Sequence, residues 1–171
     1  PPSPPPLPSC HYSSMASIAV SNSQSGSPAV DSAKPKPEML RRVSAIVAAT
    51  AKGMGIGKDG GLPWKLPGDM RYFRKVTSTV EKQNHFNAVI MGRKTWESIP
   101  KKFRPLSGRI NVVLSKDPEA RTKYDIPENV QVATSLSKGL AELNMVRTKT
   151  PIETVFVIGG GNVYKEAMDT G

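Results

Sequence analysis

The chain has 171 residues, with 24 Lys or Arg against 14 Asp or Glu and a formal net charge of +10. This length suits one domain of ordinary size. The single cysteine excludes a disulfide framework, and no Cys or His has a neighbour at metal-ligand spacing, so we expect no metal site. No apolar run approaches the roughly 18 residues of a membrane span, so we expect no membrane association.

Residues 1–40 differ in composition from the rest. Nine of the sixteen prolines fall in residues 1–38, and residues 1–30 contain no Lys, Arg, Asp or Glu. We interpret 1–40 as a disordered Pro/Ser-rich extension and 41–171 as the folded domain. Transit peptides share the acid-poor, Ser-rich character of this opening but are Arg-rich, and residues 1–40 hold no Arg. We therefore expect a cytoplasmic protein, with a mitochondrion or plastid as the alternative.

The net charge lies wholly on the folded part. Lys34 and Lys36 offset Asp31 and Glu38, which leaves 22 basic and 12 acidic residues in 41–171. This excess favours an anionic partner, whether a nucleotide, a nucleic acid or an acidic small molecule. A solvated basic surface without a partner is the alternative.

In chain order, short apolar runs alternate with amphipathic segments. The apolar runs predict strands at 43–50, 87–91, 109–114, 130–132 and 154–158. Helices are expected from Leu66-Pro67 onward, at 92–99, at 136–143 and after the triple glycine 159–161, with polar loops at 101–108 and 119–128. Alternation of this kind is typical of an α/β fold, a doubly wound, mainly parallel sheet flanked by helices.

The conspicuous motifs all follow strands. A glycine-rich loop comes after 43–50, Gly-Arg-Lys-Thr after 87–91, Ser-Lys after 109–114 and Gly-Gly-Gly after 154–158. Ligands of parallel sheets bind outside the carboxyl ends of the strands. We therefore expect these four segments to converge on one edge of the sheet.

Asp69 is the sharpest catalytic candidate. A carboxylate in the first turn of a helix can simply complement the helix dipole. Here its neighbours on that face are Met70 and Phe73, and a carboxylate desolvated by them would suit proton exchange or the binding of a cationic heterocycle. The glycines before it fit a mobile lid, and Trp64 is either a core residue or part of that lid.

Two further groups of residues suggest anion binding. The triple glycine would present backbone N–H groups at a helix start, although it could also be only a tight turn. Arg93 and Lys94 oppose the helix dipole at their position, which suggests an external anion, and Lys116 adds a third cation. Together they suit a monophosphate ester and a pyrophosphate, as in NADPH. Arg109 could hold a carboxylate in bidentate fashion, although a surface arginine is the alternative.

Taken in order, these motifs resemble the dihydrofolate reductase family over residues 42–171. The match is carried by Gly-Ile-Gly-Lys-Asp-Gly-x-Leu-Pro-Trp (55–64), Asp69 with Phe73, Val-Ile-Met-Gly-Arg-Lys-Thr-Trp-Glu-Ser-Ile-Pro (89–100), Arg-Pro-Leu-x-Gly-Arg (104–109) and Val-Ile-Gly-Gly-Gly-x-Val-Tyr (157–164).

The resemblance implies that NADPH reduces 7,8-dihydrofolate to tetrahydrofolate for one-carbon metabolism. Asp69 would be the catalytic residue, binding the pteridine and supporting protonation at N5. The implied substrate-binding residues are Val47, Ala49, Met70, Phe73, Ser98, Ile99, Leu106 and Arg109, the last holding the glutamate α-carboxylate. The implied cofactor-binding residues are Ala49, Gly55, Ile56, Gly57, Lys58, Asp59, Gly60, Gly61, Trp64, Arg93, Lys94, Thr95, Leu114, Ser115, Lys116, Ile158, Gly159, Gly160, Gly161, Asn162, Val163 and Tyr164.

The family continues with further strands after the point where this sequence stops. We accordingly expect a domain that is incomplete at its C-terminus, missing its last strands, and weakly active or inactive by itself. Asp at position 69 and the Pro/Ser-rich opening are also compatible with a longer, bifunctional protein in which a thymidylate synthase domain follows this one. We expect a monomer for a lone domain and a dimer for such a fusion.

Two other functions remain as alternatives. A noncatalytic nucleotide- or RNA-binding module could use the same basic edge, but few aromatic side chains stand ready to stack on bases. A related pterin or pyrimidine reductase could share the fold. The Leu-Pro-Trp loop and Arg109 favour folate over that third possibility.

Overall fold

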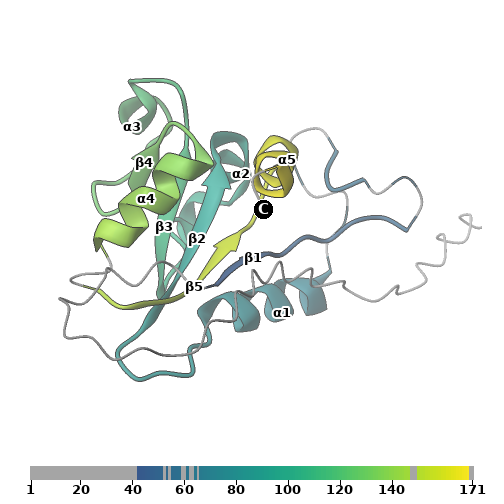
Figure 1. Ribbon diagram of the computed structural model, residues 1–171. Coiled ribbons are helices and arrows are strands. Elements are labelled where there is room, and N and C mark those ends of the chain that lie inside the picture. Colours follow the sequence, from purple (N-terminus) through teal and green to yellow (C-terminus); the bar gives the residue numbers. More distant parts are fainter. Residues whose placement is uncertain are drawn as a thin grey trace, which may run out of the picture.

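The computed structural model describes residues 42–51, 53, 55–58, 61, 64, 66–146 and 150–169. Within these residues five strands form one sheet in the order β1-β5-β2-β3-β4, and every neighbouring pair is parallel (Figure 1). The strands are β1 (Val43–Ala45), β2 (Phe86–Gly92), β3 (Arg109–Leu114), β4 (Gln131–Ala133) and β5 (Ile152–Val157). The helices are α1 (Pro67–Ser78), α2 (Arg93–Ser98), the 3-10 helix η1 (Lys101–Phe103), α3 (Ala120–Lys123), α4 (Leu136–Val146) and α5 (Gly161–Asp169).

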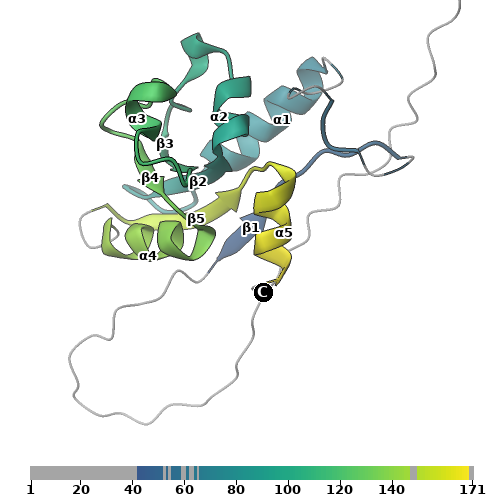
Figure 2. The same cartoon turned by 90° about the horizontal axis from the view of Figure 1, so that it is seen from above.

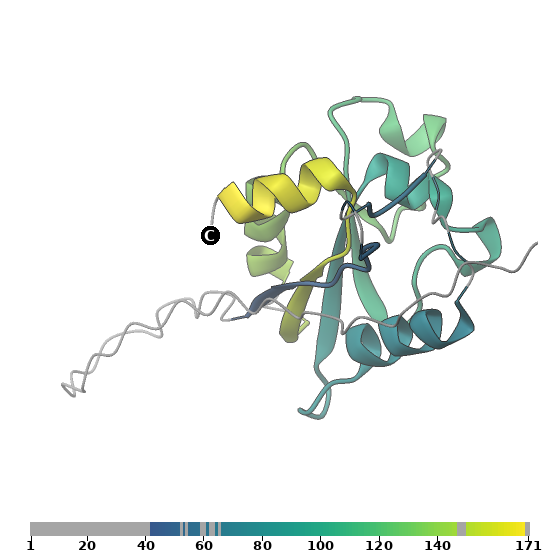
Figure 3. The same cartoon turned by 90° about the vertical axis from the view of Figure 1, so that its right-hand side faces the viewer.

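The helices cover both faces of the sheet, which confirms the expected α/β architecture. Figures 2 and 3 show α4 and α5 on one side of the strands and α1 and α2 on the other. Strand β2 demonstrates why both faces must be covered. Its side chains alternate between two core clusters, with Ala88 and Ile90 in one and Val89 and Met91 in the other, and all four are fully buried.

Helix α1 forms from a sequence with clear start signals. Pro67 occupies its first turn, where a missing N–H costs nothing, and Asp69 places a negative charge near the positive end of the helix dipole. One side of the helix turns towards the sheet, because Thr77 is fully buried and Val76 packs against the core. The opposite side is exposed, and Met70 is 51% accessible.

The structure differs from the expected elements in three places, one of which is the 3-10 helix η1 within the expected loop at 101–108. The prediction that the first strand continues to Thr50 is wrong, because β1 pairs only with β5 and its register ends at Ala45 opposite Val157. The chain then turns, and the Thr50 N–H donates to the Gly55 carbonyl at 2.9 Å. The segment expected to be a polar loop at 119–128 contains the one-turn helix α3. The expectations for residues 1–40 and for Asp59 and Gly60 lie outside the described residues.

Two buried or half-buried polar side chains connect β2 and β5 to the turn that follows α1. Asn87 is 1% exposed, donates to the Thr79 carbonyl at 2.8 Å and accepts from the Thr154 N–H at 3.2 Å. The Glu153 carboxylate accepts from the backbone N–H groups of Lys82 and Glu81 at 3.0 Å. These bonds hold the turn against the sheet and thereby set the position of α1.

None of the helices in the described part of the chain has both the length and the apolar composition needed to cross a membrane.

Glu153→Gln should lower the stability of the protein near neutral pH by about 0.5–1.5 kcal/mol, because the amide replaces a charged acceptor of two backbone N–H groups. Hydrogen bonds from Lys82 and then from Glu81 lower the pKa of Glu153. The carboxylate's contribution is therefore present above the unfolded-state pKa and is lost as pH falls through the lower folded-state pKa. The difference between variant and parent should shrink below about pH 4.

Denaturant unfolding from acid to neutral pH measures this difference. Glu128→Gln, at an exposed glutamate in the loop before β4, is the matched control and should stay within about 0.5 kcal/mol of the parent. Equal effects of the two substitutions at neutral pH would show that the hydrogen bonds from Glu81 and Lys82 to Glu153 do not stabilise the protein.

Candidate functional site

A cavity of about 290 Å³ lies at the carboxyl edge of the sheet. Three of the four segments expected to converge there do so: the glycine loop after β1, the start of α2 after β2, and the triple glycine after β5. The fourth segment, Ser115 and Lys116, follows β3 at the neighbouring position and does not line the cavity. The lining residues are Val47, Ala48, Ile56, Gly57, Lys58, Gly61, Lys94, Thr95, Ser98, Ile158, Gly159, Gly160, Gly161 and Tyr164.

The close approach of two backbone segments shapes this cavity. The Gly92 N–H at the end of β2 donates to the Gly159 carbonyl at 2.7 Å. Gly159 has a φ of +112°, and a Cβ there would lie 3.2 Å from the Tyr164 ring. A Cβ at Gly92 would lie 3.2 Å from Val163. Glycine at both positions therefore lets the ends of β2 and β5 meet at the floor of the cavity.

Tyr164 joins α5 to the first strand across the cavity. Its hydroxyl donates to the Ile46 carbonyl at 2.7 Å, directly after β1. Burial raises the pKa of Tyr164, so the phenol keeps its proton throughout the physiological pH range and remains a hydrogen-bond donor. The bond fixes the wall from which Val47 and Ala48 face the cavity.

Asp69 stands in the first turn of α1 and is half-buried. Its carboxylate makes no hydrogen bond or ion pair with any residue in the described part of the chain. Phe73, one turn further along, is half-buried as well, whereas Met70 is 51% accessible. Asp69 is therefore a carboxylate that remains available to a ligand, beside an open apolar surface.

Arg109 begins β3 and is held by the helix opposite. Its Nη1 donates to the Thr77 hydroxyl at 2.7 Å, its Nε donates to the Ser107 carbonyl at 3.1 Å, and its guanidinium lies 6.0 Å from the centre of the Phe73 ring. Burial, and then the positive charge of Arg74, lower the pKa of Arg109. Among the described residues Arg109 has no acidic partner, so this oriented guanidinium is free to bind an anion.

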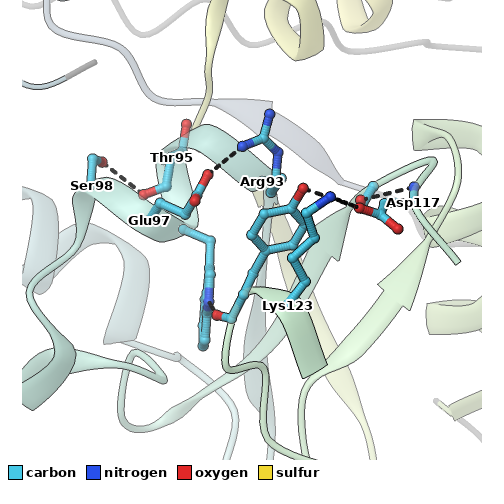
Figure 4. A network of polar contacts seen from close by, with 9 residues as sticks. Arg93, Thr95, Glu97, Ser98, Asp117 and Lys123 are labelled. Atoms are coloured by element: carbon cyan, nitrogen blue, oxygen red, sulfur yellow. Dashed lines mark hydrogen bonds and ion pairs between the residues drawn. The ribbon is translucent and has the colours of Figure 1, made fainter. Parts of the chain in front are cut away.

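The cations that follow β2 and β3, at the carboxyl edge of the sheet, differ in their surroundings. Lys94 is exposed and lines the cavity. Arg93 is paired with Glu97 at 2.6 Å and stacks over the Tyr124 ring at 4.8 Å (Figure 4). Ser115 is buried and its Oγ accepts from the Asp117 N–H at 3.2 Å, whereas Lys116 is exposed.

The remaining candidates fall into three groups. Leu114 and Val163 are buried in the core, and Ile99 and Leu106 pack against it. Exposed and outside the cavity lining are Ala49, Gly55 and Asn162. Trp64 is half-buried, and its indole N–H is buried without a hydrogen-bond partner among the described residues.

Three residues at the candidate site were not among the predicted site residues. Ala48 lines the cavity, whereas the resemblance implied Val47 and Ala49, because the chain leaves strand geometry after Ala45. Thr77, in the helix that carries Asp69, accepts a hydrogen bond from Arg109 and orients it. Tyr124 lies in a segment interpreted as polar loop, and its being the one aromatic residue in 119–128 was the available signal.

In the described ranges there is no group of three or more His, Cys, Asp or Glu side chains that could hold a metal ion.

Gly159→Ala should destabilise the protein by about 1–3 kcal/mol, because an L-residue at this φ is strained and its Cβ meets the Tyr164 ring. Gly68→Ala is the matched control. Gly68 lies in the first turn of α1 with open space around its missing Cβ, so the change should be neutral or should stabilise by about 0.4–1 kcal/mol. Denaturant unfolding compares the two, and equal stabilities would contradict the role assigned to Gly159.

Comparison with known proteins adds an independent observation. A family model described as dihydrofolate reductase matches residues 42–171. The chain is 46% identical over 140 residues to a bifunctional dihydrofolate reductase-thymidylate synthase of Glycine max, covering 81% of this chain and 26% of that protein. It is 50% identical over 136 residues to a second such bifunctional protein, of Arabidopsis thaliana, covering 78% and 23%.

The chain is also 46% identical over 124 residues to a dihydrofolate reductase of Saccharomyces cerevisiae, covering 72% of this chain and 58% of that protein. It thus spans about a quarter of the two plant relatives and somewhat over half of the yeast one. With the family model matching well over half of the sequence, the chain belongs to the dihydrofolate reductase family.

Proposed function

We propose that this protein catalyses the NADPH-dependent reduction of 7,8-dihydrofolate to 5,6,7,8-tetrahydrofolate. The observation that carries the proposal is the cavity at the carboxyl edge of the sheet, in which the glycine loop, α2 and the triple glycine meet. A hydride transfer needs no protein nucleophile. It needs alignment of two ligands, a proton route and exclusion of water, and this chain offers residues for each task.

The residues lining the cavity fit a phosphorylated dinucleotide. The described lining includes Lys58 and Lys94 but no Asp or Glu, so its charge favours phosphates. At Gly159 and Gly160 the absence of side chains lets a ligand approach the backbone, and α5 begins directly afterwards with its positive dipole end. The volume of about 290 Å³ is at the small end for ligand pockets and suits one end of the dinucleotide. NADPH, when bound, supplies the hydride.

Asp69 is the proposed proton-handling group. A half-buried carboxylate that has no partner among the described residues can accept hydrogen bonds from the amino group and ring nitrogen of a pteridine. It would thereby orient the heterocycle and support protonation at N5, through a water molecule. The apolar surface beside it, formed by Phe73 and Met70, suits the aminobenzoyl part of the substrate.

Arg109 is the proposed anchor for the α-carboxylate of the substrate's glutamate. The bonds to Thr77 and Ser107 fix the guanidinium before a ligand arrives, which reduces the entropy lost on binding. The desolvation that lowers its pKa also strengthens an ion pair formed there.

The proposal extends to assembly and location. For a lone domain we propose a monomer, and for a fusion with a thymidylate synthase domain a dimer. The proposed location is the cytoplasm, with a mitochondrion or plastid as the alternative.

Asp69→Asn should lower dihydrofolate-dependent NADPH oxidation by about 100-fold or more, because the amide cannot take part in proton transfer as a carboxylate does. The affinity for NADPH, measured by fluorescence titration, should change less than about twofold, because Asp69 does not line the cavity proposed for the cofactor. Asp125→Asn is the matched control, since this carboxylate is exposed and pairs with Lys101 at 3.1 Å.

Unchanged turnover in Asp69→Asn would remove this residue from the mechanism. An unsubstituted chain that binds NADPH but never oxidises it in the presence of dihydrofolate would instead favour the noncatalytic nucleotide-binding function.

Thr77→Val should raise the KM for dihydrofolate by about 5- to 10-fold. Arg109 loses a bond that orients it, and the Nη1 group of this half-buried arginine is left without its acceptor. The kcat and the affinity for NADPH should stay nearly constant. Thr77→Ser keeps the hydroxyl and should remain within about twofold of the parent. A steady-state titration of dihydrofolate separates these outcomes, and a lowered kcat with constant KM would argue against carboxylate binding by Arg109.

A further inference from the structure

A connected cluster of charged residues lies beside the cavity, at the carboxyl ends of β2 and β3 (Figure 4). It runs from Glu97 through Arg93 to the Tyr124 ring, and from the Tyr124 hydroxyl and Lys123 to Asp117. Arg93 binds Glu97 at 2.6 Å and lies 4.8 Å from the ring centre. The Asp117 carboxylate accepts from Lys123 at 2.9 Å and from the Tyr124 hydroxyl at 3.2 Å.

The register of the sheet places the two halves of this cluster next to each other. Gly92 at the end of β2 is paired with Leu114 at the end of β3. Arg93 and Ser115 follow these two residues directly, so they leave neighbouring strands that are about 4.8 Å apart. The segment 115–117 and the start of α2 therefore border the same part of the edge.

Asp117 poses an electrostatic problem at this position. Under the proposed function, on which this inference rests, NADPH brings a 2′-phosphate, a monophosphate ester, to the carboxyl edge of the sheet. The cations expected from the sequence to hold that ester include Arg93 and Lys116, which stand beside Ser115. A carboxylate two residues after Ser115 would repel a phosphate dianion and lower the affinity for it. The ribose of NADH, which carries no phosphate, would not be repelled in this way.

Lys123 and Tyr124 neutralise that carboxylate. The hydrogen bond from Lys123 is the largest cause of a lowered pKa of Asp117, and the same bond raises the pKa of Lys123. Both groups thus remain ionised as a pair. The Tyr124 hydroxyl donates to the same Asp117 oxygen, while the ring of Tyr124 supports the Arg93 guanidinium.

We infer that Lys123 and Tyr124 are specificity-determining residues, which hold Asp117 in an ion pair so that this edge accepts a nucleotide with a 2′-phosphate. Neither needs to touch the phosphate. Lys123 acts through Asp117, and Tyr124 acts through both Asp117 and Arg93. The one-turn helix α3 positions both residues, since Lys123 is its last residue and Tyr124 follows it.

The test uses two probes that differ only in the phosphate: adenosine 2′,5′-bisphosphate and 5′-AMP, titrated by calorimetry. Lys123→Gln should weaken binding of the bisphosphate by about 3- to 10-fold at low salt, and less at high salt, because the freed Asp117 charge acts over a short, screened distance. Binding of 5′-AMP should change less than about twofold. Tyr124→Phe should give a smaller loss for the bisphosphate, since it removes one hydrogen bond to Asp117 and keeps the ring.

A second substitution separates neutralisation from direct contact. Asp117→Asn added to Lys123→Gln should restore most of the bisphosphate affinity if Lys123 acts by neutralising Asp117. In the Asp117→Asn background, Lys123→Gln should then cost little bisphosphate affinity, whereas it should cost as much as in the parent if Lys123 is itself a phosphate ligand. Lys165→Gln is the matched control, because Lys165 forms a surface pair of similar length with Asp169 on α5, 3.0 Å apart.

The outcomes distinguish this inference from the proposed function. Equal losses for both probes, no loss at all, or no rescue by Asp117→Asn would overturn the roles of Lys123 and Tyr124. The reductase function would still stand if the unsubstituted protein oxidises NADPH with dihydrofolate. A parent protein that binds neither the bisphosphate nor NADPH would overturn both.

Discussion

The parallel direction of all described strands is the constraint on which the site depends. Parallel neighbours end at the same edge, so segments that are far apart in the sequence leave the sheet side by side. The bond from the Gly92 N–H to the Gly159 carbonyl is the point of closest approach. Because neither glycine carries a side chain, the two backbones can meet there, and Gly159 to Gly161 line the cavity with backbone.

Two kinds of cation stand around the proposed ligand regions at the two ends of the strands, and their partners decide what each can do. Arg109 and Lys94 have no acidic partner in the described part of the chain, and both can therefore offer a full charge to a ligand. Arg93 and Lys123 are paired with Glu97 and Asp117. A net charge of +10 alone does not reveal this difference, because it counts paired and unpaired side chains equally.

Helix α1 connects the two proposed ligand regions. Its first turn carries Asp69 and its last turns carry Thr77, which orients Arg109 on β3. The position of the helix in turn depends on Glu153 and Asn87, which hold the turn after it against β5 and β2. Residues far from any ligand therefore set the separation between the carboxylate and the guanidinium.

The sequence by itself determined the order of strands and helices along the chain and the parallel sheet, because buried apolar runs and glycine turns are local signals. The family was indicated separately, by the resemblance of several motifs in a consistent order. The sequence also indicated Asp69, Arg109 and the triple glycine as site candidates, although each residue type has an ordinary structural role in such a place as well. Only the tertiary structure decided that β1 ends at Ala45, that Ala48 faces the cavity and that Thr77 and Tyr124 support arginines. These features arise from pairing partners distant in the chain, and no local pattern encodes which side chain a distant segment will meet.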